Sequence, residues 1–142
     1  MWELITKIFN NVPPENSNYS ILYIEDDIKD RNRVEKIMTK RNIRVRFATD
    51  GETGLEMVHQ EKPSLVLLDI VLPRMNGIEV CKQLKKDERT KNIPVIFLTD
   101  MDTPKNLIDC YEYGAEDFIN KSISPRILTS LIELTLKEYS SP

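Results

Sequence analysis

The stretch Leu65-Val66-Leu67-Leu68-Asp69 is an unbroken apolar run that ends in a carboxylate. An apolar side chain at every position is typical of a central strand in a parallel sheet, because helices cover both faces of such a sheet. A carboxylate at the end of a buried strand costs stability unless it is ligated or hydrogen-bonded. We therefore expect residues 65–69 to form the middle of the fold and Asp69 to have a chemical role.

Strand and helix patterns alternate along the rest of the chain. Further strands are predicted over residues 21–25, 43–48, 94–98 and 117–119, and the period-2 pattern of 43–48 is that of an edge strand. Helices are predicted over residues 28–40, 51–60, 104–113 and 125–138, with another opening at Asn76-Gly77 and with Ser124 as the cap of the last. This alternation predicts an α/β fold with a doubly wound, five-stranded parallel sheet.

The first nineteen residues stand apart from this pattern, and we interpret residues 1–19 as an arm and 20–142 as the domain. The apolar residues of the arm recur at helical spacing over residues 2–10, which predicts a short amphipathic helix: Trp2, Ile5, Ile8 and Phe9. A polar, proline-bearing tether follows over residues 11–18. A frayed tail is the alternative interpretation.

The composition excludes several classes of protein. A chain of 142 residues fits one domain with its own core, and a formal net charge of -3 gives no basic surface for direct nucleic-acid binding. There is neither an apolar span of about 20 residues that could cross a membrane nor a convincing signal peptide. Cys81 and Cys110 lack metal-ligand spacing, so we expect packed thiols. We expect a cytoplasmic protein with no membrane attachment.

Polar residues follow several of the predicted strands. Glu25-Asp26-Asp27 end the first strand and Asp69 the third, while Thr99 and Lys121 follow the fourth and fifth. The carboxyl ends of parallel strands meet at one edge of the sheet, so these side chains should share a cleft. Mg²⁺ prefers oxygen ligands and is held by one or two carboxylates with water and phosphate. The cleft thus predicts a site for a divalent cation and a transferable phosphoryl group. Alternatively, the adjacent acids after the first strand open the next helix, whose dipole favours negative charge.

Taken together and in this order, these residues resemble the receiver domain of two-component response regulators, of the single-domain kind found in chemotaxis regulators. The similarity covers residues 20–138 and includes Asp69 through Gly77, Leu98-Thr99, and the run Gly114 to Ile119 before Lys121. The resemblance implies a flavodoxin-like sheet with strand order 2-1-3-4-5. It also implies that Asp69 accepts a phosphoryl group, that Thr99 and Lys121 contact that group, and that Thr99 and Phe118 move on activation.

The resemblance further implies an Mg²⁺ cofactor and a set of protein partners. The ligands would be Asp26 acting through water, Asp27 directly, Asp69, and the backbone carbonyl of Val71. The phosphoryl donor would be a histidine kinase or a phosphotransfer protein, and the chain would catalyse only its own phosphorylation and dephosphorylation. The signal would pass to a downstream protein target or an output domain through residues 104–113, 117–119 and 125–138. Whether the chain forms a homodimer, and whether it acts alone or belongs to a longer regulator, stays open.

Two residues depart from the family's usual pattern. Ser122 stands where the family has a proline joined by a cis bond, and a non-proline cis bond costs about 2.5–4 kcal/mol, which leaves the reach of Lys121 open. Asp100 stands where a small residue is usual. It either faces the cleft, where it would repel a phosphoryl group, or it faces solvent or caps helix 104–113.

Two other functions compete with the receiver interpretation. A magnesium-dependent phosphohydrolase also uses an aspartyl nucleophile on a doubly wound sheet. Such enzymes usually carry a second acid two residues beyond the nucleophile, where this chain has Val71. A receiver-like adaptor that is never phosphorylated is the second alternative, and the complete set of acids argues against it.

Overall fold

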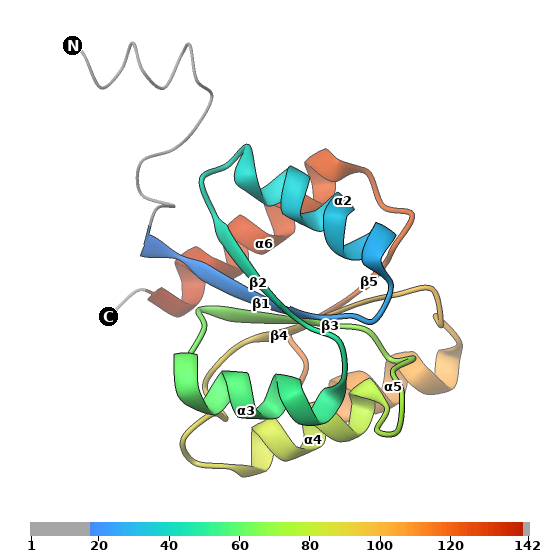
Figure 1. Ribbon diagram of the computed structural model, residues 1–142. Helices are drawn as coiled ribbons and strands as arrows, with labels where there is room; N and C mark the ends of the chain where they lie inside the picture. Colours follow the sequence, from blue (N-terminus) through green and yellow to red (C-terminus); the bar gives the residue numbers. More distant parts are fainter. Residues whose placement is uncertain (1–17, 141–142) are drawn as a thin grey trace, which may run out of the picture.

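A five-stranded parallel sheet in the order β2-β1-β3-β4-β5 forms the centre of the computed structural model, which describes residues 18–140 (Figure 1). Its strands are β1 (Ser20–Ile24), β2 (Arg44–Ala48), β3 (Leu65–Leu68), β4 (Val95–Thr99) and β5 (Asp117–Asn120). The helices are α2 (Ile28–Thr39), α3 (Gly51–Glu61), α4 (Gly77–Lys86), α5 (Pro104–Glu112) and α6 (Pro125–Ser140). The predicted fold class and strand order are confirmed. The arm predicted over residues 1–19 lies almost wholly outside the described residues.

Helices cover both faces of the sheet. Figure 1 shows α2 and α6 on one face and α3, α4 and α5 on the other. Successive residues of β1 alternate between the two cores: Ile21 and Tyr23 pack with α2 and α6, whereas Leu22 and Ile24 pack with α3 and α4. All four residues of β3 are buried, as a central strand requires. In residues 18–140 no helix has the length and apolar character needed to span a membrane.

Polar side chains begin the helices and so fix where each one starts. Thr103 caps α5 by accepting a hydrogen bond from the Asn106 N–H, and Ser124 caps α6 as predicted. The alternative in which Asp100 caps α5 is therefore wrong, and Asp100 is exposed.

Cys81 and Cys110 are buried free thiols, which confirms the prediction of packed thiols. Burial raises the pKa of Cys81 to about 11 and that of Cys110 to about 12, so both stay protonated at neutral pH.

The loop between β3 and α4 is held against its own strand by a glycine. The Gly77 N–H donates to the Ile70 carbonyl at 2.8 Å, which closes the loop directly behind Asp69. A Cβ atom at Gly77 would collide with the Asp69 carbonyl oxygen and approach the Ile70 Cα to 3.1 Å. These neighbours are backbone atoms and have no rotamer to change, so only glycine allows this approach.

We predict that Gly77→Ala lowers the free energy of unfolding by roughly 3 kcal/mol, because the added methyl group pushes on backbone. Urea denaturation measures the loss. Gly54→Ala is the matched control: its new methyl would meet the Ile24 side chain, which can shift, and alanine favours a helix interior. An equal or larger loss in Gly54→Ala would contradict the special role of Gly77.

Candidate functional site

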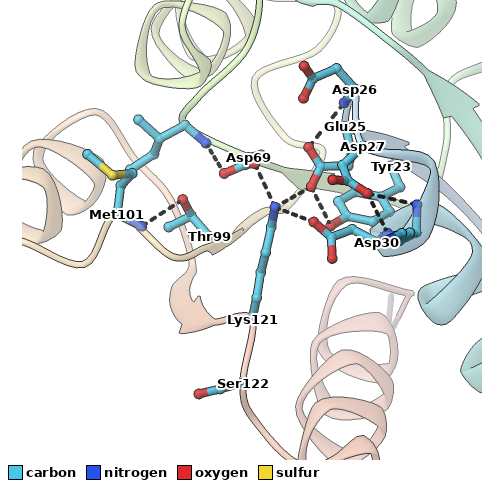
Figure 2. Close-up of polar contacts among 12 residues, drawn as sticks. Tyr23, Glu25, Asp26, Asp27, Asp30, Asp69, Thr99, Met101, Lys121 and Ser122 are labelled. Atoms are coloured by element: carbon cyan, nitrogen blue, oxygen red, sulfur yellow. Dashed lines mark hydrogen bonds and ion pairs between the residues drawn. The ribbon is translucent and has the colours of Figure 1, made fainter.

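The side chain of Lys121 lies at the centre of a cluster of carboxylates, at the edge of the sheet where β1, β3 and β5 end (Figure 2). Its ammonium donates to Asp69 Oδ2 at 2.8 Å, to Asp30 Oδ2 at 2.7 Å and to Glu25 Oε1. Burial alone would lower the pKa of Lys121, but these hydrogen bonds raise it above its ordinary value, so the ammonium is charged. The structure thus brings Lys121 and Asp69 together, as the sequence predicted.

The reach of Lys121 does not depend on a cis bond. Residues 18–140 contain no cis peptide, so the Lys121–Ser122 bond is trans. Ser122 uses the N–H that a proline would lack, because it donates to Asn120 Oδ1 at 2.8 Å. The Asn120 amide in turn donates to Asp102 at 3.0 Å and so ties this turn to the loop before α5.

Asp69 directly follows β3 and is buried. Its Oδ1 accepts the Ile70 N–H at 2.7 Å, and its Oδ2 accepts from Lys121. The Asp69 N–H donates to the Ile24 carbonyl at 3.2 Å and joins the ends of β3 and β1. Two donors therefore offset the cost of burying this carboxylate, and both depend on where neighbouring strands end.

Glu25 is the most buried acid of the site, and the sequence analysis did not assign it a role. Its Oε1 accepts from the Tyr23 hydroxyl at 3.4 Å as well as from Lys121, and its Oε2 accepts the Asp26 N–H at 3.0 Å. Burial raises the pKa of Glu25 to about 8; Lys121 opposes that shift, and Asp69 adds to it. The sequence placed Glu25 at the end of β1 and in the shared cleft, but the equivalence of this place to that of Asp69 after β3 was not used to give it a role.

Asp27 has the structural role that the sequence left open as an alternative. It is the N-cap of α2, because its Oδ1 accepts the Lys29 N–H at 2.8 Å and the Asp30 N–H at 3.2 Å. Figure 2 shows the Asp27 carboxylate turned toward the start of α2. Asp26 is exposed, and its carboxylate points away from Lys121. Asp27 is thus held at the start of α2, whereas the Asp26 carboxylate faces solvent.

Thr99 and Phe118, the predicted moving residues, lie on neighbouring strands. The buried Thr99 hydroxyl accepts the Met101 N–H at 3.2 Å, so it is held by its own loop. The Lys121 N–H donates to the Thr99 carbonyl at 3.1 Å and connects the ends of β4 and β5. Phe118 is half-buried, and its ring centroid lies 6.4 Å from that of Phe97. Val71, in the loop after β3, is 56% exposed.

His59, near the end of α3, has a half-buried side chain, with Nε2 at 3.7 Å from Asp87 Oδ2. Asp87 belongs to the loop after α4, so the pair joins that loop to α3 and lies apart from the cleft residues described above. It contributes to packing between helices.

Comparison with known proteins gives one answer. Residues 21–133 match the response regulator receiver domain family. The chain is 35% identical over 118 residues to the transcriptional regulatory protein AfsQ1 of Streptomyces coelicolor, an alignment that covers 83% of this chain and 51% of that protein. The chain spans about half the length of the curated relatives it matches.

Solved structures agree with the sequence match. The BeF3-activated N-terminal receiver domain of Klebsiella pneumoniae RstA has a TM-score of 0.77 and 32% identity, with 83% of this chain and 98% of that chain covered. A CheY-like response regulator receiver domain protein from Methanospirillum hungatei has a TM-score of 0.80 and 27% identity, with 85% and 95% covered. Since the sequence match spans most of the domain and the fold agrees, the chain belongs to the receiver domain family of two-component response regulators.

Proposed function

We propose that Asp69 accepts a phosphoryl group from a histidine kinase or a phosphotransfer protein, in a reaction that needs Mg²⁺. The observation that carries the proposal is the buried Asp69 carboxylate held 2.8 Å from the Lys121 ammonium. A carboxylate beside a fixed cation is a suitable nucleophile for phosphorus, and the same cation can bind a phosphoryl oxygen afterwards. Val71, two residues beyond Asp69, supplies no second acid for a phosphohydrolase.

The donor set of the cleft suits a divalent cation. Glu25, Asp30 and Asp69 surround a single ammonium, so the cluster carries more negative than positive charge. All the donors are oxygens, which Mg²⁺ prefers. Within residues 18–140 no three acidic, histidine or cysteine side chains are already arranged around a metal position. Binding would therefore require side chains such as exposed Asp26 to turn inward.

We assign the Mg²⁺ ligands to Asp26, Asp69 and the backbone carbonyl of Val71, with Glu25 beside them. Asp27 would have to give up two hydrogen bonds at the start of α2 in order to bind the ion, whereas Asp26 is free to turn. In this proposal Asp26, rather than Asp27, contacts Mg²⁺ directly. When bound, Mg²⁺ offsets the negative charge on the transferring phosphoryl oxygens.

The chain's own residues have distinct parts in the transfer. An Asp69 oxygen attacks phosphorus, and the new O–P bond forms as the P–N bond to the donor histidine breaks and the imidazole departs with a proton. Lys121 orients the Asp69 carboxylate and binds the phosphoryl oxygens, and the Thr99 hydroxyl donates to one of them after leaving Met101. Hydrolysis later breaks the O–P bond and returns the carboxylate and inorganic phosphate.

The surface that we propose to carry the signal is formed by α5, β5 and α6. Lys121 and Thr99 are joined through backbone, so a change at either reaches both β4 and β5. On α5 three large side chains are exposed: Leu107, Ile108 and Tyr111. Tyr111 donates to Asp117 at 3.2 Å and so links α5 to the start of β5. Such an apolar surface suits a protein target, an output domain or a second copy of the chain.

We predict that the protein gains the mass of one phosphoryl group when incubated with Mg²⁺ and acetyl phosphate, and that Asp69→Asn abolishes the gain. The reason is that the amide oxygen of asparagine is a poor nucleophile. Intact mass spectrometry measures both proteins. Asp109→Asn, at an acid paired with Lys105 on α5, is the control and should retain the gain. A full gain in Asp69→Asn would refute the assignment.

We also predict that Asp26→Asn weakens Mg²⁺ binding by at least about tenfold, the lower end of what even outer-shell substitutions cost. Asp27→Asn should leave the affinity within about twofold, because asparagine caps a helix as well as aspartate does. Calorimetric titration with Mg²⁺ compares the two variants, which remove the same charge at adjacent positions. A larger loss of Mg²⁺ affinity in Asp27→Asn would show that Asp27, not Asp26, is the direct ligand.

A further inference from the structure

Asp30 contacts the catalytic lysine from the first turn of α2, and the roles assigned above leave it unused. Its Oδ2 lies 2.7 Å from Lys121 Nζ, as close as the Asp69 oxygen at 2.8 Å. Its backbone N–H donates to the Asp27 cap, so the main chain of Asp30 is fixed while its side chain can rotate. Figure 2 shows the Asp30 carboxylate entering the cluster from the side opposite Asp69.

The three carboxylates use the full donor capacity of the lysine. An ammonium has three N–H groups, and in this structure they are directed to Glu25, Asp30 and Asp69. A phosphoryl group on Asp69 can therefore gain a hydrogen bond from Lys121 only if one of these contacts is given up. The acid that yields most readily is the one that water can solvate when it is released.

Burial identifies that acid. The side chain of Glu25 is 0% exposed and that of Asp69 is 6% exposed, whereas that of Asp30 is 33% exposed. Releasing Asp30 therefore returns a carboxylate to water, while releasing Glu25 leaves a buried carboxyl group without its ammonium donor. We propose, on the basis of the phosphorylation proposed above, that Asp30 is a positioning residue that competes with the phosphoryl group for Lys121. It holds the ammonium in the resting state and lowers the affinity of the site for a phosphoryl group.

The test is the affinity of the full chain for beryllofluoride, an analogue of a phosphoryl group on aspartate, at fixed Mg²⁺ by calorimetry. Asp30→Asn should bind about two- to fivefold more tightly than the native protein, the range expected for a partly exposed ion pair. Asp30→Glu keeps the charge and should restore the native affinity to within about twofold. The gain in Asp30→Asn should shrink as KCl is added, because salt screens the charge that was removed.

Glu35→Gln separates competition for Lys121 from a general change in charge. It removes one negative charge from an exposed position of the same helix, and its beryllofluoride affinity should equal that of the native protein. A gain in Glu35→Gln equal to that in Asp30→Asn would overturn the inference. The inference would also be overturned if Asp30→Asn bound beryllofluoride with native affinity, or more weakly, while the native protein binds it normally. If the native protein binds no beryllofluoride, the proposed phosphorylation fails and this inference fails with it.

Discussion

The rest of the site depends on one ammonium surrounded by three carboxylates. Lys121 supplies a single positive charge to the three acids Glu25, Asp30 and Asp69, and two of these side chains are buried. Unpaired buried charge is costly, and the fold reduces that cost with main-chain donors at Ile70 and Asp26. What remains uncompensated is an excess of negative charge. In the function proposed above, that excess would attract a divalent cation, and the bound cation would then favour a phosphoryl group.

The sheet brings these charges together through the places where its strands end. Asp69 follows β3, Glu25 follows β1 and Lys121 follows β5, so their positions are set by main-chain hydrogen bonds rather than by flexible loops. The close approach of Gly77 to the backbone of Asp69 fixes this residue from behind. At the end of β5, Asn120 links the turn after this strand to the loop before α5. In the proposed function, a change in the contacts of Lys121 would reach the α5, β5 and α6 surface through these links.

Much of this arrangement could be predicted from the sequence, and the exceptions have physical reasons. The apolar run before Asp69 identified a central strand, and strand ends at a common edge predicted its meeting with Lys121. The resemblance implied Asp27 as the direct Mg²⁺ ligand, whereas the structure shows it as the cap of α2. An acid between a strand and a helix can bind a cation or cap the helix, and the choice depends on where each element ends. Asp30 was missed because the direction of a helical side chain depends on how α2 packs on the sheet.

The most direct test of this account is the stability of the Mg²⁺-free protein as a function of pH, with and without Glu25→Gln. The pKa of Glu25 is raised in the folded state, so the folded protein keeps a proton that the unfolded chain has lost between about pH 4.5 and 8. Stability should therefore fall by about 2–4 kcal/mol as pH rises through that window. Glu25→Gln should remove most of this fall in stability. In the native protein at pH 8, saturating Mg²⁺ should restore the stability that is lost. The same pH dependence in Glu25→Gln, or no stabilisation by Mg²⁺, would contradict the account.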